Sequence, residues 1–381
     1  MTETALVHGM EGELVQPDWP VLRLDELQLL LNRFPEAGTV EEILSYSPRP
    51  FSSASIVRTS RGQLFVKRHH HSVRNREELL EEHRLLRYLH SHGGRVVEIL
   101  TDEHGESVIE DGVWSYEVHR QAAGLDLYKD AHSWTPFRST AHASAAGKAL
   151  ADLHLAAEGY SAPRRQARTL TAGFHIFSQL DPWPALELYV GSHHELSLFL
   201  DERDWRKKVE DALLPWHRKL MPYLDALPPL WTHNDLHASN LLWSEESDEA
   251  DVVSVIDFGL SDCTTAACDL ANAIERNCIR WLEPEGDFNA VVQWKQIHAL
   301  LDAYDKVRPL SRKEAESIAA ILPLVHAEFA LSETDYFLRI LKSEENAALG
   351  WDGYCLDHAH WFTTGTGQRL LQELNQWAEK R

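Results

Sequence analysis

Two short polar segments flank a pair of apolar runs in the middle of the chain, and this arrangement constrains the fold more than any other feature. The polar segments are residues 233–240 and 256–259, and the apolar runs between them are 241–243 and 252–255. Apolar runs joined by a polar turn are typical of a β-hairpin. Such a hairpin would bring the two polar segments together at its open end.

Three side chains of these segments suit the transfer of a phosphoryl group. Asp235 and Asn240 lie five residues apart on one loop, and the hairpin brings Asp257 to them. Mg²⁺ prefers oxygen ligands and keeps several waters and phosphate oxygens, so one carboxylate and one amide are enough protein ligands. Asp257 and Asn240 can supply them. The second carboxylate, Asp235, can orient an acceptor hydroxyl and accept its proton.

The same residues resemble a known family of kinases. His-x-Asp-x-x-x-x-Asn followed by Ile-Asp-Phe-Gly is similar to the motifs of the superfamily of aminoglycoside phosphotransferases, choline kinases and type II homoserine kinases. These enzymes have no Arg between the His and the Asp, as in His233-Asn234-Asp235, whereas most protein kinases do. The resemblance implies an α+β, protein-kinase-like bilobal fold. It also implies that Asp235 is the catalytic base and that Asn240 and Asp257 are magnesium ligands.

A kinase also needs a lysine on a strand for the nucleotide phosphates and a helix carboxylate that holds this lysine. Lys67 ends the apolar run 64–66, and Glu82 follows fifteen residues later in a segment of helical periodicity. We predict that both belong to the nucleotide site. Glu78 and Glu81 lie on the same predicted helix, so the glutamate that pairs with Lys67 stays open.

Segment 47–54 occupies the place of a phosphate-binding loop. It contains no glycine, in contrast to many members of the superfamily. The backbone amides and the hydroxyls of Ser52 and Ser53 would therefore donate to the phosphates. An ordinary surface turn is nearly as good an interpretation of this segment.

The chain changes character near residues 120–124. Residues 1–119 combine β-type runs with helical periodicity, whereas 125–381 are mostly helical in pattern. We predict a nucleotide-binding lobe at 1–119 with a small antiparallel sheet, a hinge at 120–124, and a larger helical lobe at 125–381 with the catalytic loop and the acceptor site. By similarity to the family, the adenine edge would lie against the backbone of Arg120 and Ala122.

Local patterns predict individual elements of the first lobe. Leucines at helical spacing indicate helices, and short β-branched or aromatic runs beside turn residues indicate strands. The predicted helices are 22–34 and 76–89, and the predicted strands are 55–58, 64–67, 96–100 and 113–118.

Carboxylates beside aromatic residues in the helical lobe are candidates for the acceptor site. Such neighbours suit an amine cation or a polyhydroxy ring. The candidates are Glu275, Trp281, Asp335 and Tyr336. The same residues also fit ordinary helix packing, and the sequence does not choose among amino alcohols, sugars and aminoglycoside-like acceptors.

His69-His70-His71 is a conspicuous run, but three consecutive side chains at the end of a strand do not point the same way. No cysteine or carboxylate stands beside the run at metal-ligand spacing. We therefore do not predict a zinc site there.

The net charge of -22 would repel nucleic acid and anionic membranes. No apolar stretch of about 18 residues occurs, the first residues lack the pattern of a signal peptide, and the four cysteines show no pairing motif. We predict a cytoplasmic monomer or homodimer that uses ATP, Mg²⁺ and a small-molecule hydroxyl acceptor, with neither nucleic acid nor membrane as partner.

Three hypotheses of function follow. The first is an ATP- and Mg²⁺-dependent phosphotransferase that moves the γ-phosphate to a hydroxyl of a small molecule. The second is a protein Ser/Thr kinase, which is disfavoured because no Ala-Pro-Glu follows 257–259. The third is a nucleotide-binding protein without catalysis, which the presence of the lysine, both aspartates and the asparagine disfavours.

Overall fold

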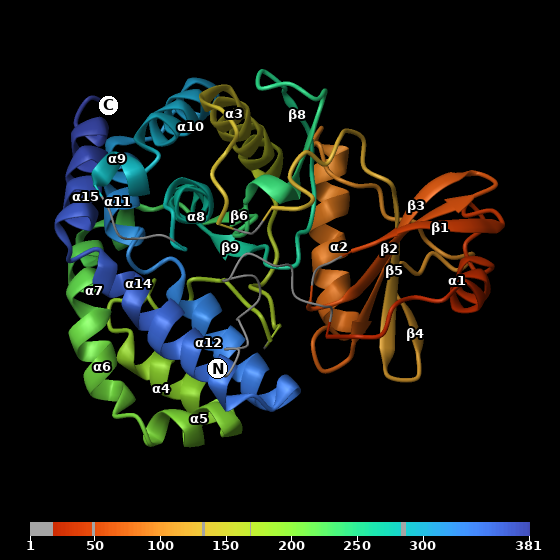
Figure 1. Ribbon diagram of the computed structural model, residues 1–381, viewed down its shortest axis with the longest axis horizontal. Coiled ribbons are helices and arrows are strands. Elements are labelled where there is room, and N and C mark those ends of the chain that lie inside the picture. Colours follow the sequence, from red (N-terminus) through yellow and green to blue (C-terminus); the bar gives the residue numbers. More distant parts are fainter. Residues whose placement is uncertain (1–17, 48–49, 132–133, 168, 283–286) are drawn as a thin grey trace, which may run out of the picture.

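The computed structural model describes residues 18–47, 50–131, 134–167, 169–282 and 287–381. In these ranges a small antiparallel sheet with two helices stands beside a larger, mostly helical part (Figure 1). This is the predicted α+β architecture.

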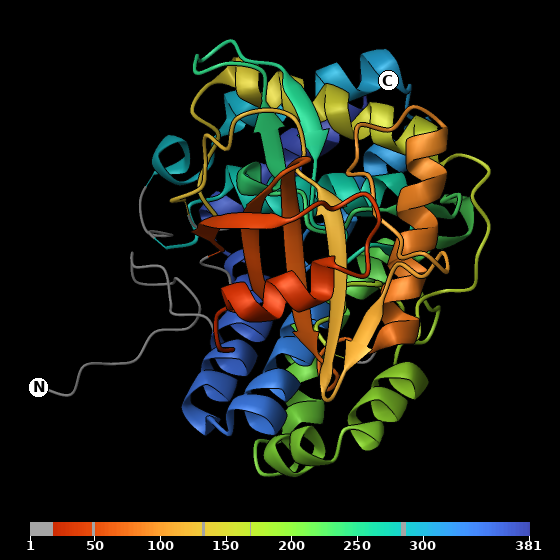
Figure 2. The ribbon, with the colours of Figure 1, turned by 90° about the vertical axis from the view of Figure 1, so that its right-hand side faces the viewer.

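The small part is built on a five-stranded antiparallel sheet in the order β1-β2-β3-β5-β4. Helix α1 crosses its outer face, whereas α2 lies between the sheet and the helical part (Figures 1 and 2). Both predicted helices and the hairpin of β2 and β3 are confirmed. The elements are α1 (Leu24–Leu31), β1 (Val40–Tyr46), β2 (Ser53–Thr59), β3 (Gly62–His70), α2 (Arg76–Ser91), β4 (Ile109–Asp111) and β5 (Trp114–Arg120).

The predicted strand at 96–100 is wrong. This segment makes a single bridge, between Ile99 and His119. Strand β4 pairs with β5 from Trp114 to Tyr116. On that side of β5 only the opposite end, at His119, is left for Ile99 to pair with.

Two hydrophobic clusters hold the small part in place. The first lies between α1 and the sheet and includes Leu27, Leu31, Val57 and Val66. The second is the large core of the helical part, and Leu85, Leu86 and Leu89 of α2 belong to it. Helix α2 therefore packs its leucines into the core of the helical part, whereas His83 on the same helix contacts Glu117 of the sheet.

A capping box fixes the start of α2. The side chain of Asn75 accepts a hydrogen bond from the amide of Glu78, and the carboxylate of Glu78 accepts one from the amide of Asn75. This exchange satisfies amides that a helix start leaves unpaired.

The large part contains helices and two short antiparallel ladders, β6 with β9 and β7 with β8. Its elements are α3 (Thr140–Ala157), α4 (Trp183–Ser192), α5 (His194–Asp201), α6 (Trp205–Ala212), α7 (Leu214–Leu220), η1 (Met221–Ala226), β6 (Leu230–Thr232), η2 (Ala238–Asn240), β7 (Leu241–Trp243), β8 (Val252–Val255), β9 (Asp262–Thr264), α8 (Ala266–Cys278), α9 (Phe288–Val291), α10 (Trp294–Val307), α11 (Arg312–Ile321), α12 (Ala327–Tyr336), η3 (Phe337–Leu341), α13 (Glu344–Ala348), η4 (Leu349–Asp357), α14 (His358–Trp361) and α15 (Gly365–Ala378).

The two ladders position both polar segments. Leu241 of β7 pairs with Val255 of β8, which confirms the predicted hairpin. Beyond its open end, the amide of Ile256 donates to the carbonyl of Asn240 at 2.9 Å. Strands β6 and β9 pair on the other side of the same segments, so each polar loop is held at both ends.

The division of the chain at 120–124 stays a prediction. Strand β5 ends at Arg120, and Leu125 exchanges two backbone hydrogen bonds with Trp243, at 2.8 and 2.9 Å. Within the described ranges, no helix has the length and apolar character needed to cross a membrane.

A close contact between α3 and α10 depends on Gly147. A Cβ atom at this position would lie 2.1 Å from the carbonyl oxygen of Leu300. We expect Gly147→Ala to lower the free energy of unfolding by about 1–3 kcal/mol, because the two helix backbones must move apart. Urea unfolding measures the change.

Gly191→Ala on α4 is the matched control, because a Cβ atom there would meet nothing within 4 Å. Alanine is the better helix former, so this variant should keep or gain up to about 1 kcal/mol of stability. Equal losses in both variants would contradict the close contact of α3 and α10.

Candidate active site

One pocket brings together residues from the sheet and from both polar segments. Five of the predicted site residues line it, namely Ser52, Lys67, Asp235, Asn240 and Asp257. They come from the residue before β2, from β3, and from the loops around the β7–β8 hairpin. The fold thus gathers residues that lie up to 205 positions apart in the sequence.

Lys67 and Asp257 form an ion pair across this pocket, with Nζ donating to Oδ1 at 3.1 Å. Burial acts to lower the pKa of Lys67, but the charges of Asp257, Glu117 and Glu82 outweigh it and raise the pKa. Burial acts to raise the pKa of Asp257, but Lys67 outweighs it and holds the pKa well below the usual range. Both groups are therefore charged at neutral pH.

Glu82 is near this pair but does not join it. Lys67 forms its ion pair with Asp257, whereas the carboxylate of Glu82 lies 3.7 Å from Arg165 Nη2. Glu82, one of the three glutamates that the sequence left open, therefore forms no direct ion pair with Lys67 between these described side chains. Arg165 holds Glu82, and Glu117 lies opposite Lys67 in the register of β3 and β5.

Asp235 lies between two basic side chains. Its carboxylate is 3.4 Å from Arg276 Nε and 3.6 Å from His237 Nε2. Burial acts to raise the pKa of Asp235, but the charges of His237 and Arg276 outweigh it and lower the pKa. The carboxylate is consequently ionised and able to accept a hydrogen bond from a hydroxyl.

Asn240 fixes the backbone of the same loop. Its Nδ2 donates to the carbonyl oxygen of Asp235 at 2.9 Å and lies 3.3 Å from Asp235 Oδ2. The amide nitrogen is therefore taken up by Asp235, and the amide oxygen is the atom that a cation can use.

Asp269 holds the first polar segment, residues 233–240, by hydrogen bonds to its backbone. Its carboxylate accepts hydrogen bonds from the amides of His233 and Asn234, both at 2.8 Å, and lies 3.0 Å from His154 Nε2. Burial acts to raise the pKa of Asp269, but the bond to His154 outweighs it and lowers the pKa. Asp269 and His154 therefore hold the backbone of this loop in place.

Two residues of the loops adopt left-handed backbone conformations. Asn234 and Asp257 both have φ of 60°, which is strained for a residue with a side chain. Asn234 compensates through its side-chain oxygen, which accepts hydrogen bonds from Thr232 at 2.8 Å and Thr264 at 3.1 Å. His233 donates to the carbonyl of Ile256 at 2.9 Å and so ties the two loops together.

Two buried arginines hold the chain after Asp257, and no sequence pattern predicted them. Arg74 and Arg165 both donate to the carbonyl of Gly259, each at 3.0 Å. Burial, followed by the charge of Arg165, lowers the pKa of Arg74 to about 10. Neither arginine belongs to a sequence motif, and only the tertiary structure brings the two side chains to this carbonyl.

The rest of the pocket lining includes a direct neighbour of the predicted Glu275 and several aromatic residues. Arg276 and Glu333 line the pocket, together with Trp134, Phe329 and Tyr354. Adjacent side chains on a helix point about 100° apart, so Arg276 of α8 lines the pocket whereas its neighbour Glu275 does not.

The four predicted acceptor residues are buried and are not among the described residues that line this pocket. Glu275 accepts a hydrogen bond from Trp134 Nε1 at 3.2 Å, and Trp281 stacks on His358 with ring centroids 3.8 Å apart. Asp335 pairs with Arg339 at 3.2 Å, and the hydroxyl of Tyr336 donates to Asp18 at 2.6 Å.

The remaining nucleotide candidates lie outside the described lining of the pocket. The hydroxyl of Ser53 donates to the carbonyl of Pro20. The amide of Arg120 donates to the carbonyl of Glu98 at 2.9 Å, and Ala122 is partly exposed. Positions 48–49 of the predicted phosphate loop lie outside the described residues.

The sheet, the helical part and this grouping of charged residues define a kinase-like phosphotransferase fold. Residues 51–310 match the phosphotransferase enzyme family, and the chain belongs to that family. The predicted superfamily is thereby confirmed.

A curated relative, the homoserine kinase of Nitrobacter hamburgensis, is 26% identical over 223 residues, which cover 58% of this chain and 59% of the relative. The chain thus spans about three fifths of the length of this relative.

Two solved structures share the fold. A microcompartment-associated aminopropanol kinase has a TM-score of 0.58 at 15% identity, with 93% of this chain and 99% of that chain covered. An amicoumacin kinase in complex with AMP-PNP and Ca²⁺ has a TM-score of 0.53 at 14% identity, with 93% of each chain covered. At these identities the similarity concerns the fold alone.

The buried carboxylate of Asp269 generates a prediction about stability and pH. Its folded pKa lies below the usual value, so its contribution is present above about pH 4 and is lost as the pH falls further. We expect Asp269→Asn to lower the free energy of unfolding by about 1.5–3 kcal/mol near neutral pH, because a charged acceptor is lost. The difference from the wild type should shrink below about pH 4.

Urea unfolding near neutral pH and below about pH 4 measures this difference in the free energy of unfolding. The exposed Asp251 provides a control, and Asp251→Asn should match the wild type at both pH values. A loss of stability that is the same at both pH values would contradict a role for the charge of Asp269.

Proposed function

We propose that this protein is an ATP- and Mg²⁺-dependent phosphotransferase that moves the γ-phosphate to a hydroxyl of a small molecule. The observation that carries the proposal is the meeting of Lys67, Asp235, Asn240 and Asp257 in one pocket of a chain from the phosphotransferase enzyme family. Phosphoryl transfer depends on positioning and charge stabilisation, which these groups provide.

Lys67 is the residue that we assign to the nucleotide phosphates. Its ammonium group points into the pocket toward Asp257 and is held in the charged form. The hydroxyl and amide of Ser52 lie on the same wall. The negative charge of Glu82 helps to raise the pKa of Lys67. The amide of Arg120 already donates to the carbonyl of Glu98, so we place the adenine edge against the backbone near Ala122.

Asn240 and Asp257 have the oxygen donors that Mg²⁺ requires. Asp257 is accessible, with 41% of its side chain exposed, and the amide oxygen of Asn240 is left for a cation. The residues therefore fit the ion. When bound, Mg²⁺ would neutralise the charge of the transferred phosphate.

Asp235 is the residue that we assign to the acceptor hydroxyl. Ionised beside Arg276 and His237, it orients the hydroxyl by accepting its hydrogen bond and takes the proton as the new bond forms. Asn240 keeps this carboxylate in place by its hydrogen bond to the Asp235 carbonyl.

An amino alcohol is the acceptor class that fits the pocket wall best. Glu333 contributes negative charge, and Trp134 and Tyr354 contribute aromatic faces that suit an ammonium group. The related chains named homoserine kinase and aminopropanol kinase support this class. Arg276 adds a positive charge for an acceptor that also bears a carboxylate.

Replacement of the lysine tests the nucleotide site. We expect Lys67→Met to weaken the binding of a non-hydrolysable ATP analogue with Mg²⁺ by about 10-fold to 100-fold, because a charge-assisted contact to phosphate is lost. Isothermal titration calorimetry measures the Kd. Lys295→Met, at an exposed position of α10, is the control, and equal affinities of the two variants would count against the assignment.

Replacement of Asp235 tests catalysis. ADP release from ATP and Mg²⁺ is measured with a panel of homoserine, amino alcohols, choline, sugars and aminoglycosides. We expect at least one amino alcohol to stimulate release, and Asp235→Asn to lower the stimulated rate by about 10²-fold to 10⁴-fold without loss of nucleotide binding. Asp251→Asn should retain the full rate.

A panel in which no small acceptor stimulates ADP release would overturn the proposed reaction. The same holds for an Asp235→Asn variant with unchanged activity. Faster phosphorylation of a peptide than of any small alcohol would instead favour a protein kinase.

A further inference from the structure

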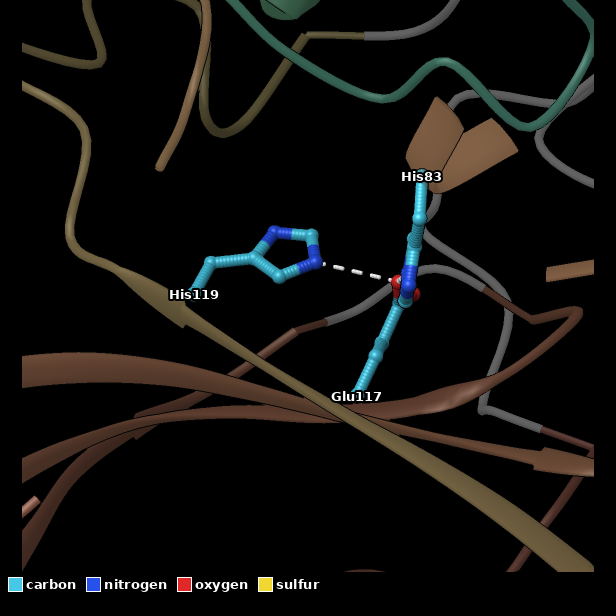
Figure 3. A group of neighbouring side chains, drawn as sticks. All are labelled: His83, Glu117 and His119. Atoms are coloured by element: carbon cyan, nitrogen blue, oxygen red, sulfur yellow. Dashed lines mark hydrogen bonds and ion pairs between the residues drawn. The ribbon is translucent and has the colours of Figure 1, made fainter. Parts of the chain in front are cut away.

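A group of buried polar side chains lies in the interior of the small part, where an apolar core would be usual. Glu117 of β5 is at its centre, and three imidazole nitrogens surround the carboxylate. His83 Nε2 lies 2.7 Å and His119 Nε2 lies 3.0 Å from Glu117 Oε2, while His69 Nε2 lies 3.0 Å from Oε1. Figure 3 shows the rings of His83 and His119 directed at the same carboxylate.

Regular secondary structure creates this grouping. Glu117 and His119 are two residues apart on one strand and therefore share a face. His69 is on β3, beside β5 in the sheet, and His83 reaches the same face from α2. All four residues are nearly or fully buried, with at most 7% of the residue surface exposed.

The three ligand atoms of His83, Glu117 and His119 lie within 4.8 Å of one another. Two imidazole nitrogens and one carboxylate oxygen are a donor set of Zn²⁺ and similar transition metal ions. Mg²⁺ prefers oxygen donors, so this group differs in kind from Asn240 and Asp257.

Further contacts orient the ligand atoms, as neighbouring groups do in metal sites. Ser107 Oγ lies 2.9 Å from His83 Nδ1 and can accept a hydrogen bond from Nδ1–H, the tautomer in which Nε2 carries no proton and can bind an ion. His69 donates to the other oxygen of Glu117. His69 also lines the pocket of Lys67 and Asp257, so the group lies next to that pocket.

We propose that His83, Glu117 and His119 form a binding site for a divalent transition metal ion of the Zn²⁺ class, supported by His69 and Ser107. The ion takes the place of the protons that otherwise lie between the two rings and the carboxylate. In each neutral ring the single proton moves from Nε2 to Nδ1, so binding requires a change of tautomer and no net loss of protons from the rings.

The site is coupled to the nucleotide pocket by charge. Glu117 lies directly opposite Lys67 in the register of β3 and β5, and its charge helps to keep Lys67 protonated. An ion bound to Glu117 compensates part of this negative charge. Occupancy of the site therefore changes the electrostatic environment of the phosphate-binding lysine.

The full chain, freed of metal with a chelator, tests the proposal. It is dialysed against Zn²⁺ in the presence of excess Mg²⁺, and the bound zinc is measured by plasma mass spectrometry. We expect one Zn²⁺ per chain in the wild type and binding at least about 10-fold weaker in His119→Gln. His71→Gln, whose ring lies 3.6 Å from Glu110 and outside the group, is the control and should keep the site.

Glu117→Gln is the second variant, because it keeps the shape of the side chain if His119→Gln fails to fold. Circular dichroism and thermal unfolding establish that each variant is folded. Co²⁺ gives an independent measurement, since coordination by nitrogen produces a visible absorption that both variants should lose. Absence of zinc from the wild type, or equal zinc in the wild type and a folded Glu117→Gln, would overturn the proposal.

Discussion

The carboxylate of Asp269 is the constraint on which the rest of the site depends. It is fully buried on α8 and accepts the two consecutive amides of His233 and Asn234. These amides hold the loop in a conformation that includes a left-handed residue, Asn234. The strain is offset because a buried carboxylate with good hydrogen bonds is a strong acceptor in a region of low dielectric constant. The position of Asp235 follows from this loop.

Opposite charges balance one another throughout the pocket. Lys67 faces Asp257, and Arg276 with His237 faces Asp235. Charges out of water need such partners, and the loss of one member leaves the other uncompensated. The pairs also keep each group in the protonation state that phosphoryl transfer uses. Stability and the proposed chemistry therefore rest on the same contacts.

The small part has a polar interior as well as an apolar one. Its outer cluster around α1 is a normal hydrophobic core, whereas the face beneath α2 carries Lys67, Glu117 and the histidines. Burial of so many titratable groups is costly unless each finds a partner. The hydrogen bonds of Glu117 meet this requirement, and their convergence also creates the donor set that we propose for a metal ion.

The sequence by itself determined the family, the β7–β8 hairpin and the residues Lys67, Asp235, Asn240 and Asp257, because spacing within a loop or a hairpin fixes where neighbouring side chains lie. Only the tertiary structure decided which glutamate approaches Lys67, which side of α8 and α12 faces the pocket, and where Arg74 and Arg165 bind. It also brought His83 and His119 to one carboxylate. These contacts join elements that are far apart in the chain. Packing sets the register of the strands and the rotation of each helix about its axis, and a local sequence pattern does not predict either.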